Sequence, residues 1–324
     1  MNEIRKDYLL DRWVILSPKR SKRPEQFKKQ DLPVKDENCI FCPGNEEMTT
    51  KSIIEKPHGN WRIRLIENKF PALTKECKFQ NFIEGFKNRM TGYGRHYILI
   101  DTAFHNQHPC DYTANQWQSW FETISDIFFM EMPDENIKYI SVFKNHGVEA
   151  GASQPHPHTQ IISMPLVPFL IKQEIDKAKE YYNFNGKCAF CDIIQLELKN
   201  KKRIVFQNDE VVVLCPFAPS QPYEVWVFPR KHVPSIQIGK KTRDEILKAV
   251  SNVLKAYYIG LNDKPFNLMF HILYPKMEEK QSYHFHIEIL PRIERDAGLE
   301  LGSGINITTV TPEESARFLR KFFK

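Results

Sequence analysis

Residues 156–160 read His-Pro-His-Thr-Gln and lead into two isoleucines, and residues 284–288 read His-Phe-His-Ile-Glu and lead into Ile-Leu. Ahead of each segment stand a C-x-x-C pair and one more histidine, in the same order: Cys39, Cys42 and His105 in the first half, Cys188, Cys191 and His232 in the second. That histidine precedes its segment by 51 residues in the first half and by 52 in the second. A repeat of order and spacing on this scale indicates an internal duplication.

The length and composition fit a globular protein built from two such halves. The chain has 324 residues, of which 41% are hydrophobic and 27% are charged, a balance typical of globular proteins. No apolar run reaches the roughly 18 residues that a membrane span needs, and no apolar signal segment follows the charged start. We therefore expect a cytoplasmic protein. The net charge is +6, with lysines and arginines crowded into residues 19–29, a run that suits either a solvated face or an anionic ligand.

Hydrophobic patterning predicts mixed α and β structure in both halves. Runs rich in β-branched and aromatic residues predict strands at residues 61–66, 97–100, 139–143, 211–214, 225–228 and 268–272. Apolar residues at helical spacing predict helices over residues 117–128 and 246–257. Thr242 with Glu245, and Thr311 with Glu314, have the spacing of capping boxes, which begin helices. The connection between the halves is expected near residues 166–186.

The cysteines and histidines predict two zinc sites, hence about two zinc ions per chain. A C-x-x-C turn presents two thiolates on one side, and tetrahedral zinc needs two further ligands. We assign the first site to Cys39, Cys42, His105 and His156, and the second to Cys188, Cys191, His232 and His284. The choice of His105 stays open, because His96 and His108 are close to it in sequence.

Redox-active thiols are the alternative to zinc binding, but nothing near either cysteine pair resembles the βαβ start of a thioredoxin-like domain. A nucleic-acid zinc ribbon does not fit. Its two cysteine pairs would lie roughly 15–20 residues apart, whereas 146 residues separate Cys42 from Cys188.

His158 is the candidate nucleophile. In an extended segment His156, His158 and Gln160 point to one face. If His156 binds zinc, the metal fixes the strand and presents His158 with little freedom, as covalent catalysis by imidazole requires. Gln160 can then donate a hydrogen bond to a phosphate oxygen as charge develops on it. The alternative for a histidine on a strand is a purely structural role.

Residues 145–160, N-H-G-V-E-A-G-A-S-Q-P-H-P-H-T-Q, resemble the active-site segment of the galactose-1-phosphate uridylyltransferase family, a nucleotidyltransferase branch of the histidine-triad superfamily. The resemblance extends to residues 20–24, 39–42, 67–73 and 216–229 and to the C-terminal half. It implies an α+β fold of two histidine-triad-like halves, each an antiparallel sheet with flanking helices. Residues 1–170 would form the N-terminal domain with the nucleophile and first zinc site, and residues 171–324 the C-terminal domain with the second zinc site.

The resemblance also implies roles for individual residues. His158 becomes the nucleophile and Gln160 its phosphate-binding companion. Substrate contacts are implied for Arg20 and Arg23 along the nucleotide, Asn68 at the base or ribose, and Asn145 and Ser153 at the phosphates. The alternatives are a solvated face for the arginines, a turn for Asn68 and loop capping for Asn145 and Ser153. Histidine-triad hydrolases carry a histidine where Gln160 stands, and because an amide cannot relay protons, the glutamine favours a transferase.

Three features depart from the family pattern. Lys69 follows Asn68 where an acidic residue can stand, and residues 302–304 read Gly-Ser-Gly where bulkier hexose contacts are expected. These departures put uracil and galactose recognition in doubt. The glycine-rich tail and the second cysteine pair are more similar to the ADP-glucose phosphorylase branch, which transfers AMP to free phosphate.

A further metal group is possible, because some family members bind a second metal with one glutamate and three histidines at similar positions. The matching residues here are Glu174, His271, His286 and Glu288. Because His284 and His286 point the same way from a strand, zinc on His284 is expected to crowd this group, and we favour the cysteine site. His286 occupies the place of His158 in the second half, but no counterpart of residues 145–147 precedes it, so we predict that it is not catalytic.

The sequence thus predicts uridylyl transfer between UDP-glucose and galactose 1-phosphate, by a ping-pong route through nucleotidyl-His158. Adenylyl transfer like that of ADP-glucose phosphorylase is the enzymatic alternative, and a zinc-dependent nucleotide-binding module is the non-enzymatic one. The expected partners are a nucleotide sugar, a hexose 1-phosphate and a second copy of the chain, with neither nucleic acid nor membrane.

Overall fold

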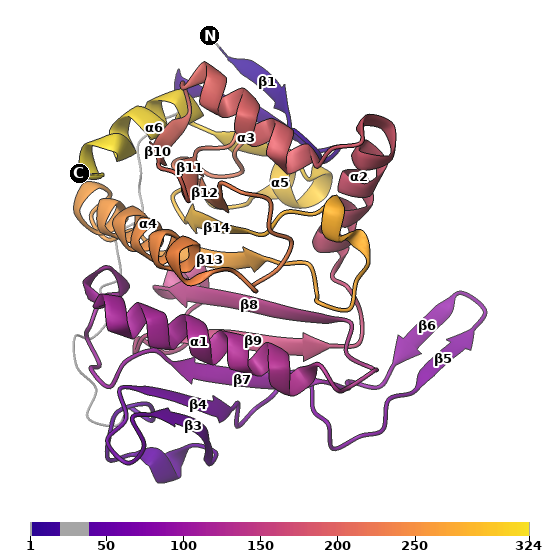
Figure 1. Ribbon diagram of the computed structural model, residues 1–324, viewed down its shortest axis with the longest axis vertical. Helices are drawn as coiled ribbons and strands as arrows, with labels where there is room; N and C mark the ends of the chain where they lie inside the picture. Colours follow the sequence, from indigo (N-terminus) through magenta and orange to yellow (C-terminus); the bar gives the residue numbers. More distant parts are fainter. Residues whose placement is uncertain (1, 20–38, 324) are drawn as a thin grey trace.

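The computed structural model describes residues 2–19 and 39–323, and its centre is one antiparallel sheet of ten strands in the order β10-β11-β12-β14-β13-β8-β9-β7-β4-β3 (Figure 1). The first half contributes β3 (Ser52–Lys56), β4 (Ile63–Glu67), β7 (Arg95–Ile100), β8 (Tyr139–His146) and β9 (His158–Met164). The second half contributes β10 (Ile204–Gln207), β11 (Val211–Leu214), β12 (Val225–Pro229), β13 (Phe266–His271) and β14 (His286–Pro291). All six predicted strands are present.

The two halves of the sheet have the same strand order. In each half, the first three strands follow one another along the sheet, the fifth pairs with the third, and the fourth lies at the inner edge. The two inner-edge strands, β8 and β13, pair with each other and join the halves into one sheet. The duplicated α+β fold expected from the repeated motif is confirmed, while the domain boundary at residue 170 stays a prediction.

One long helix from each half covers the same face of the sheet. Helix α1 (Ala114–Glu131) connects β7 to β8, and α4 (Lys240–Gly260) connects β12 to β13; the two helices contact each other (Figure 1). Both predicted apolar stripes are confirmed, since Trp117, Trp120 and Ile124 of α1 and Val250 and Leu254 of α4 are buried. These side chains pack with the sheet residues into one hydrophobic core.

Of the two predicted capping boxes, one is confirmed. Thr311 and Glu314 cap each other's backbone N–H at the start of α6 (Pro312–Leu319). The box at Thr242 is wrong, because α4 begins at Lys240 with Gly239 as its N-cap, three residues before the predicted N-cap. Thr242 lies inside the helix, and its hydroxyl donates to Glu210 at 2.6 Å. The Thr242 hydroxyl is therefore hydrogen-bonded to the carboxylate of Glu210 and does not cap the backbone of the helix.

The connection between the halves is helical. It consists of α2 (Phe169–Asn185), followed by α3 (Ala189–Asn200), whose N-cap is Cys188. The short helix α5 (Gly298–Ser303) precedes α6. Turns of 3-10 helix are η2 (Glu46–Met48), η3 (Pro109–Asp111), η4 (Val148–Ala150), η5 (Glu279–Gln281) and η6 (Arg320–Phe322). None of the helices in the described ranges has both the length and the apolar character needed to cross a membrane.

Two small sheets complete the fold of the described residues. Strands β1 (Glu3–Lys6) and β2 (Trp13–Leu16) pair with each other, and β2 pairs in parallel with β15 (Asn306–Thr308). The first strands of the chain therefore lie against the last part of the second half. A separate hairpin of β5 (Asn81–Glu84) and β6 (Lys87–Met90) projects from the body of the molecule (Figure 1).

Candidate active site and metal centres

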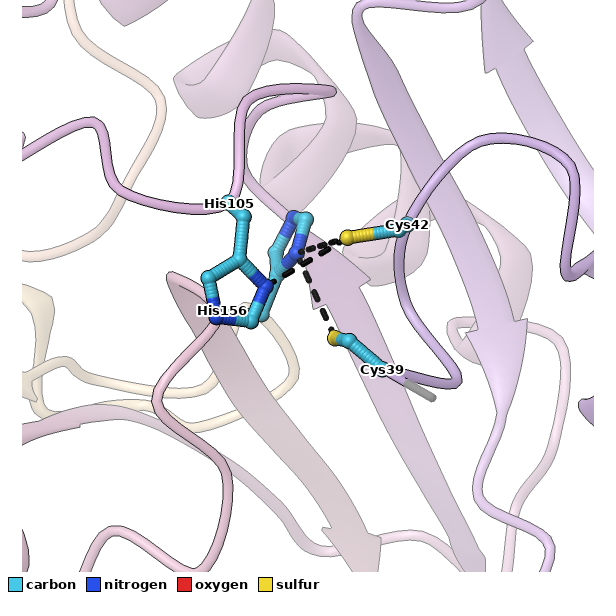
Figure 2. Close-up of side chains that lie close together, drawn as sticks. All are labelled: Cys39, Cys42, His105 and His156. Atoms are coloured by element: carbon cyan, nitrogen blue, oxygen red, sulfur yellow. Dashed lines mark hydrogen bonds between the residues drawn. The ribbon is translucent and has the colours of Figure 1, made fainter. Parts of the chain in front are cut away.

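The four ligands predicted for the first zinc site converge (Figure 2). The Nδ1 atom of His156 lies 3.7 Å from Cys39 Sγ and 3.6 Å from Cys42 Sγ, and Nδ1 of His105 lies 3.3 Å from Cys42 Sγ. A zinc ion with Zn–S bonds of about 2.3 Å and Zn–N bonds of about 2.0 Å has S···N edges of about 3.6 Å in a tetrahedron. The observed distances fit such an ion.

Local hydrogen bonds present these ligands to a common centre. The turn between the cysteines closes through a bond from Cys42 N–H to the Cys39 carbonyl, 3.1 Å long. Nε2 of His156 donates to the Thr102 carbonyl at 2.8 Å, so its Nδ1 keeps a lone pair for a metal. Burial lowers the pKa of His156 to about 4, which keeps the ring neutral as a ligand must be.

The structure resolves the choice among the three neighbouring histidines. His105 joins the cysteines, whereas Nε2 of His108 faces Asp263 at 3.2 Å. His96 lies on β7 and faces Gln160. The structure therefore places His105, and neither His96 nor His108, beside the two cysteines.

The second group repeats this geometry. Cys191 Sγ lies 3.4 Å from Nδ1 of His232 and 3.5 Å from Nδ1 of His284, and Cys188 completes the set. The two Nε2 atoms face main-chain carbonyls, that of Lys280 at 2.8 Å and that of Pro229 at 3.0 Å. The described part of the chain thus contains two groups of two cysteines and two histidines that are compatible with zinc.

His158 is the first residue of β9, and one nitrogen of its ring is hydrogen-bonded. Its Nδ1 lies 2.9 Å from the carbonyl oxygen of His156, and because a carbonyl can only accept, Nδ1 carries the proton. Nε2 of the neutral ring therefore keeps its lone pair. Burial lowers the pKa of His158, whose side chain is only 4% exposed and packs against Phe41 with ring centroids 5.4 Å apart. The ring is thus a neutral imidazole in one tautomer and one orientation.

A buried ion pair supports β9 on the face opposite to the His158 side chain. The sequence motifs did not indicate this pair. Lys144 Nζ donates to Asp101 Oδ2 at 2.7 Å and to the main-chain carbonyl of His158 at 3.1 Å. Thr159, whose side chain points away from that of His158, donates to Asp101 and accepts from Trp120 Nε1. The signal was present in the sequence: alternation along β8 places Lys144 on the same face as the apolar Val142.

Replacing Lys144 with methionine should lower the free energy of unfolding by about 3–5 kcal/mol, because Asp101 would remain buried without its cation. Adding Asp101→Asn should recover part of that loss by removing the unpaired charge. Urea unfolding of both variants at equal metal content measures the effect. A loss below about 1 kcal/mol for Lys144→Met would contradict this assignment.

Gln160 and Asn68, two predicted site residues, meet around His96. Nε2 of His96 lies 3.0 Å from Oε1 of Gln160, and Nδ1 of His96 lies 3.3 Å from Nδ2 of Asn68. Asn68 follows β4, while His96 and Gln160 belong to the paired strands β7 and β9. Sequence reasoning named His96 only as a rival zinc ligand, because its contacts cross between strands distant in sequence.

Asn145 lies at the end of β8, where the two halves meet. Its Oδ1 accepts from Asn267 Nδ2 at 2.9 Å, and the same amide group of Asn267 donates to the carbonyl of Ala150 at 2.8 Å. Asn267 therefore ties both ends of the segment that contains η4. Gly147 in this segment has φ = 81°, and an added Cβ would lie 2.8 Å from Pro265, so only glycine fits here.

The remaining predicted substrate residues are Ser153, Arg20 and Arg23. Ser153 is exposed in the loop that leads to His156. Arg20 and Arg23 lie outside the described residues.

Glu174, His271, His286 and Glu288 form a third group that shares no residue with the cysteine sites. Nδ1 of His271 lies 3.0 Å from Glu174, and its Nε2 lies 3.3 Å from Glu288. The expected crowding by His284 is absent, because Nδ1 of His284 faces Cys191, whereas His286 lies in the third group. Burial opposes protonation of His271, but the two carboxylates outweigh it and raise its pKa well above the usual value.

A family model described as galactose-1-phosphate uridyl transferase, N-terminal domain, matches residues 1–168, and one described as a domain of unknown function matches residues 112–322. The chain is 31% identical to ADP-glucose phosphorylase of Arabidopsis thaliana, over 98% of this chain and 92% of that protein. It is 32% identical to galactose-1-phosphate uridylyltransferase of Thermotoga maritima, over 99% of this chain and 98% of that protein.

Solved structures agree with these sequence relationships. The crystal structure of the Arabidopsis thaliana ADP-glucose phosphorylase with bound ADP-glucose superposes with a TM-score of 0.83 at 30% identity, over 99% of both chains. A uridylyltransferase structure superposes with a TM-score of 0.78 at 25% identity, over 99% of this chain and 98% of that one. Fold, motif and full-length similarity coincide, and the chain belongs to the galactose-1-phosphate uridylyltransferase family.

Proposed function

We propose that this protein is a nucleotidyltransferase that moves the uridylyl group of UDP-glucose to galactose 1-phosphate. In the first step Nε2 of His158 attacks the α-phosphorus, a P–N bond forms, and the bond to the bridging oxygen breaks to release glucose 1-phosphate. In the second step a phosphate oxygen of the hexose 1-phosphate attacks the same phosphorus, and the P–N bond breaks. The enzyme returns to its starting state.

The free lone pair on Nε2 of His158 is the observation that carries this proposal. The hydrogen bond from Nδ1 to the His156 carbonyl, 2.9 Å long, fixes the tautomer, so the nucleophilic nitrogen needs no base to remove a proton from it. The ring also has little rotational freedom, because it packs against Phe41 and lies on a strand held by Lys144. Fixed geometry of this kind lowers the entropic part of the barrier.

In this reaction the two four-ligand groups have a structural role and no catalytic one. Zinc bound by two thiolates and two imidazoles has no open position and acts as a cross-link. In the first site it would join the turn at Cys39 to the strand entry at His156, two residues before the nucleophile. We assign the first ion to Cys39, Cys42, His105 and His156, and the second to Cys188, Cys191, His232 and His284.

We assign the other predicted residues to substrate binding. Gln160, on the same strand face as His158, would donate to a phosphate oxygen and stabilise the charge that develops there. An amide cannot accept the proton of an attacking water molecule, which favours a phosphate acceptor over hydrolysis. We assign the phosphates also to Asn145 and Ser153, the nucleotide to Arg20 and Arg23, and the base or ribose to Asn68.

Transfer of an adenylyl group from ADP-glucose is the second candidate. It is favoured by the full-length similarity to ADP-glucose phosphorylase and by Lys69, which follows Asn68 at a position where uridylyltransferases can have an acidic residue. The nucleophile and the first step would be the same. The two candidates differ in the base recognised and in the acceptor, a hexose 1-phosphate or inorganic phosphate.

Trapping the covalent intermediate distinguishes the candidates. The protein is incubated separately with UDP-glucose and ADP-glucose, each labelled at the α-phosphate, without acceptor. Uridylyl transfer predicts an acid-labile label from UDP-glucose, released by galactose 1-phosphate. Label from ADP-glucose, released by inorganic phosphate, would replace the first candidate with the second. No label from either would refute covalent transfer and favour a nucleotide-binding module.

A cytoplasmic homodimer remains part of this proposal. The same binding scheme involves a nucleotide sugar and a sugar phosphate and gives no role to nucleic acid or to a membrane. Analytical ultracentrifugation of the purified protein tests the expected dimer.

A further inference from the structure

His96 is the side chain that connects two of the proposed substrate residues. It lies on β7, is 8% exposed, and contacts Gln160 on one side and Asn68 on the other. It belongs to neither cysteine group and does not contact the ion pair behind β9.

The hydrogen bonds of His96 fix its tautomer. The backbone N–H of Ala72 points at Nδ1 from 3.3 Å, and an N–H can only donate, so Nδ1 accepts. Burial lowers the pKa of His96, which keeps the ring neutral near pH 7. A neutral ring with an accepting Nδ1 carries its proton on Nε2, which therefore donates to Oε1 of Gln160 over 3.0 Å.

The tautomer of His96 fixes the orientation of the two neighbouring side-chain amides. Because Oε1 of Gln160 accepts from His96, the NH2 group of that amide is directed away from His96 and is available to a ligand. Asn68 is fixed in the same way: its Oδ1 accepts from Phe70 N–H at 2.9 Å, so its NH2 group faces the His96 ring, 3.3 Å from Nδ1 and 3.4 Å from Nε2. Of the two ring nitrogens only Nδ1 can accept, so donation runs from Ala72 and Asn68 through His96 to Gln160.

We propose that His96 is a positioning residue that holds the amide of Gln160 with its NH2 group toward the transferred phosphate. This proposal rests on the proposed function, in which Gln160 donates to that phosphate. Without His96 the amide could rotate by half a turn and present its carbonyl oxygen to the phosphate, replacing a favourable contact by a repulsive one. Donors that are oriented before the reaction need no reorganisation in the transition state.

Three variants test the proposal. His96→Val keeps a strand-forming side chain but removes the donor, and it should lower kcat by about tenfold. His96→Gln places an amide donor near the position of Nε2 and should recover most of that loss, whereas His96→Asn, with the same chemistry on a shorter side chain, should not. His58→Val, at an exposed histidine, serves as the matched control and should leave turnover unaltered.

A double-mutant cycle separates positioning from a general structural role. If His96 acts through Gln160, then His96→Val should cause no further loss in a Gln160→Ala background. Thermal midpoint and zinc content should match the parent in every variant. Additive losses, or equal losses in His96→Gln and His96→Val, would overturn the proposal.

The tautomer can be observed without any variant, from the ¹⁵N chemical shifts of the His96 ring, which should report a protonated Nε2. A protonated Nδ1 would overturn the proposed direction of the chain. Failure of the proposed function would look different: the unmodified protein would then form no labelled intermediate, whatever residue stands at position 96.

Discussion

His158→Gly is expected to abolish nucleotidyl transfer, with a loss of at least about 10⁴-fold in kcat, because the substitution removes the nitrogen that forms the P–N bond. The variant should keep its zinc. Nδ1 of His156 is the metal-facing atom, and its ring is anchored through Nε2 to the Thr102 carbonyl, independently of the ring at position 158. Rates with both substrates and metal analysis of the same preparation check the two statements together.

Free imidazole should restore part of the first step in His158→Gly. The missing ring leaves a buried cavity beside Phe41, and imidazole can fill it and attack the phosphorus in place of the side chain. Initial rates of the unmodified enzyme should give parallel double-reciprocal lines, as a covalent intermediate requires. Intersecting lines together with the absence of labelled enzyme would indicate direct transfer, and His158 would need another role.

His286→Gly is the matched control within the repeat. His286 occupies the equivalent position in the second half, and its Nδ1 also faces the carbonyl two residues earlier, at 3.0 Å. Its ring is fully buried and stacked on Phe228. This variant is expected to lose stability through the cavity it leaves but to retain transfer. Equal loss of transfer in both variants would contradict the assignment of catalysis to the first half.

The second large effect, on metal content and stability, is expected from the loss of either zinc site. Each of Cys39→Ser and Cys188→Ser should reduce the metal content from about two ions to about one. In small zinc domains the apparent binding free energy of a structural ion is about 10–16 kcal/mol, comparable with a whole unfolding free energy of about 5–15 kcal/mol. Both variants should therefore unfold at lower temperature and lower urea concentration.

The two sites should differ in their effect on transfer. Cys39 holds the group that includes His156, so its loss should also loosen His158 and reduce turnover strongly. Cys188, the N-cap of α3, belongs to the ligand group that includes His232 and His284 of the second half, so its loss should affect stability more than chemistry. Cys77→Ser is the control, since Cys77 belongs to neither ligand group and its thiol faces the Thr74 carbonyl. Full stability with lost turnover in Cys188→Ser would reverse this division of roles.

Much of the fold could be predicted because its signals are local. Alternating and helical apolar patterns act within one element, and all six predicted strands and both predicted helical stripes are present. The capping box at Thr242 failed for a reason that is not local. A carboxylate from the β10–β11 region, Glu210, accepts the threonine hydroxyl, and the sequence around α4 contains no sign of that partner.

By itself the sequence determined the two cysteine pairs and the candidate nucleophile, because a C-x-x-C turn and an extended H-x-H segment each place their own side chains through short-range geometry. Only the tertiary structure decided which of His96, His105 and His108 joins the cysteines and which tautomer each histidine adopts. It also brought Lys144 to Asp101, and His96 to Gln160, across separations of 43 and 64 residues. Such contacts depend on strand pairing between distant segments, which fixes the available donors and acceptors only once the sheet has formed.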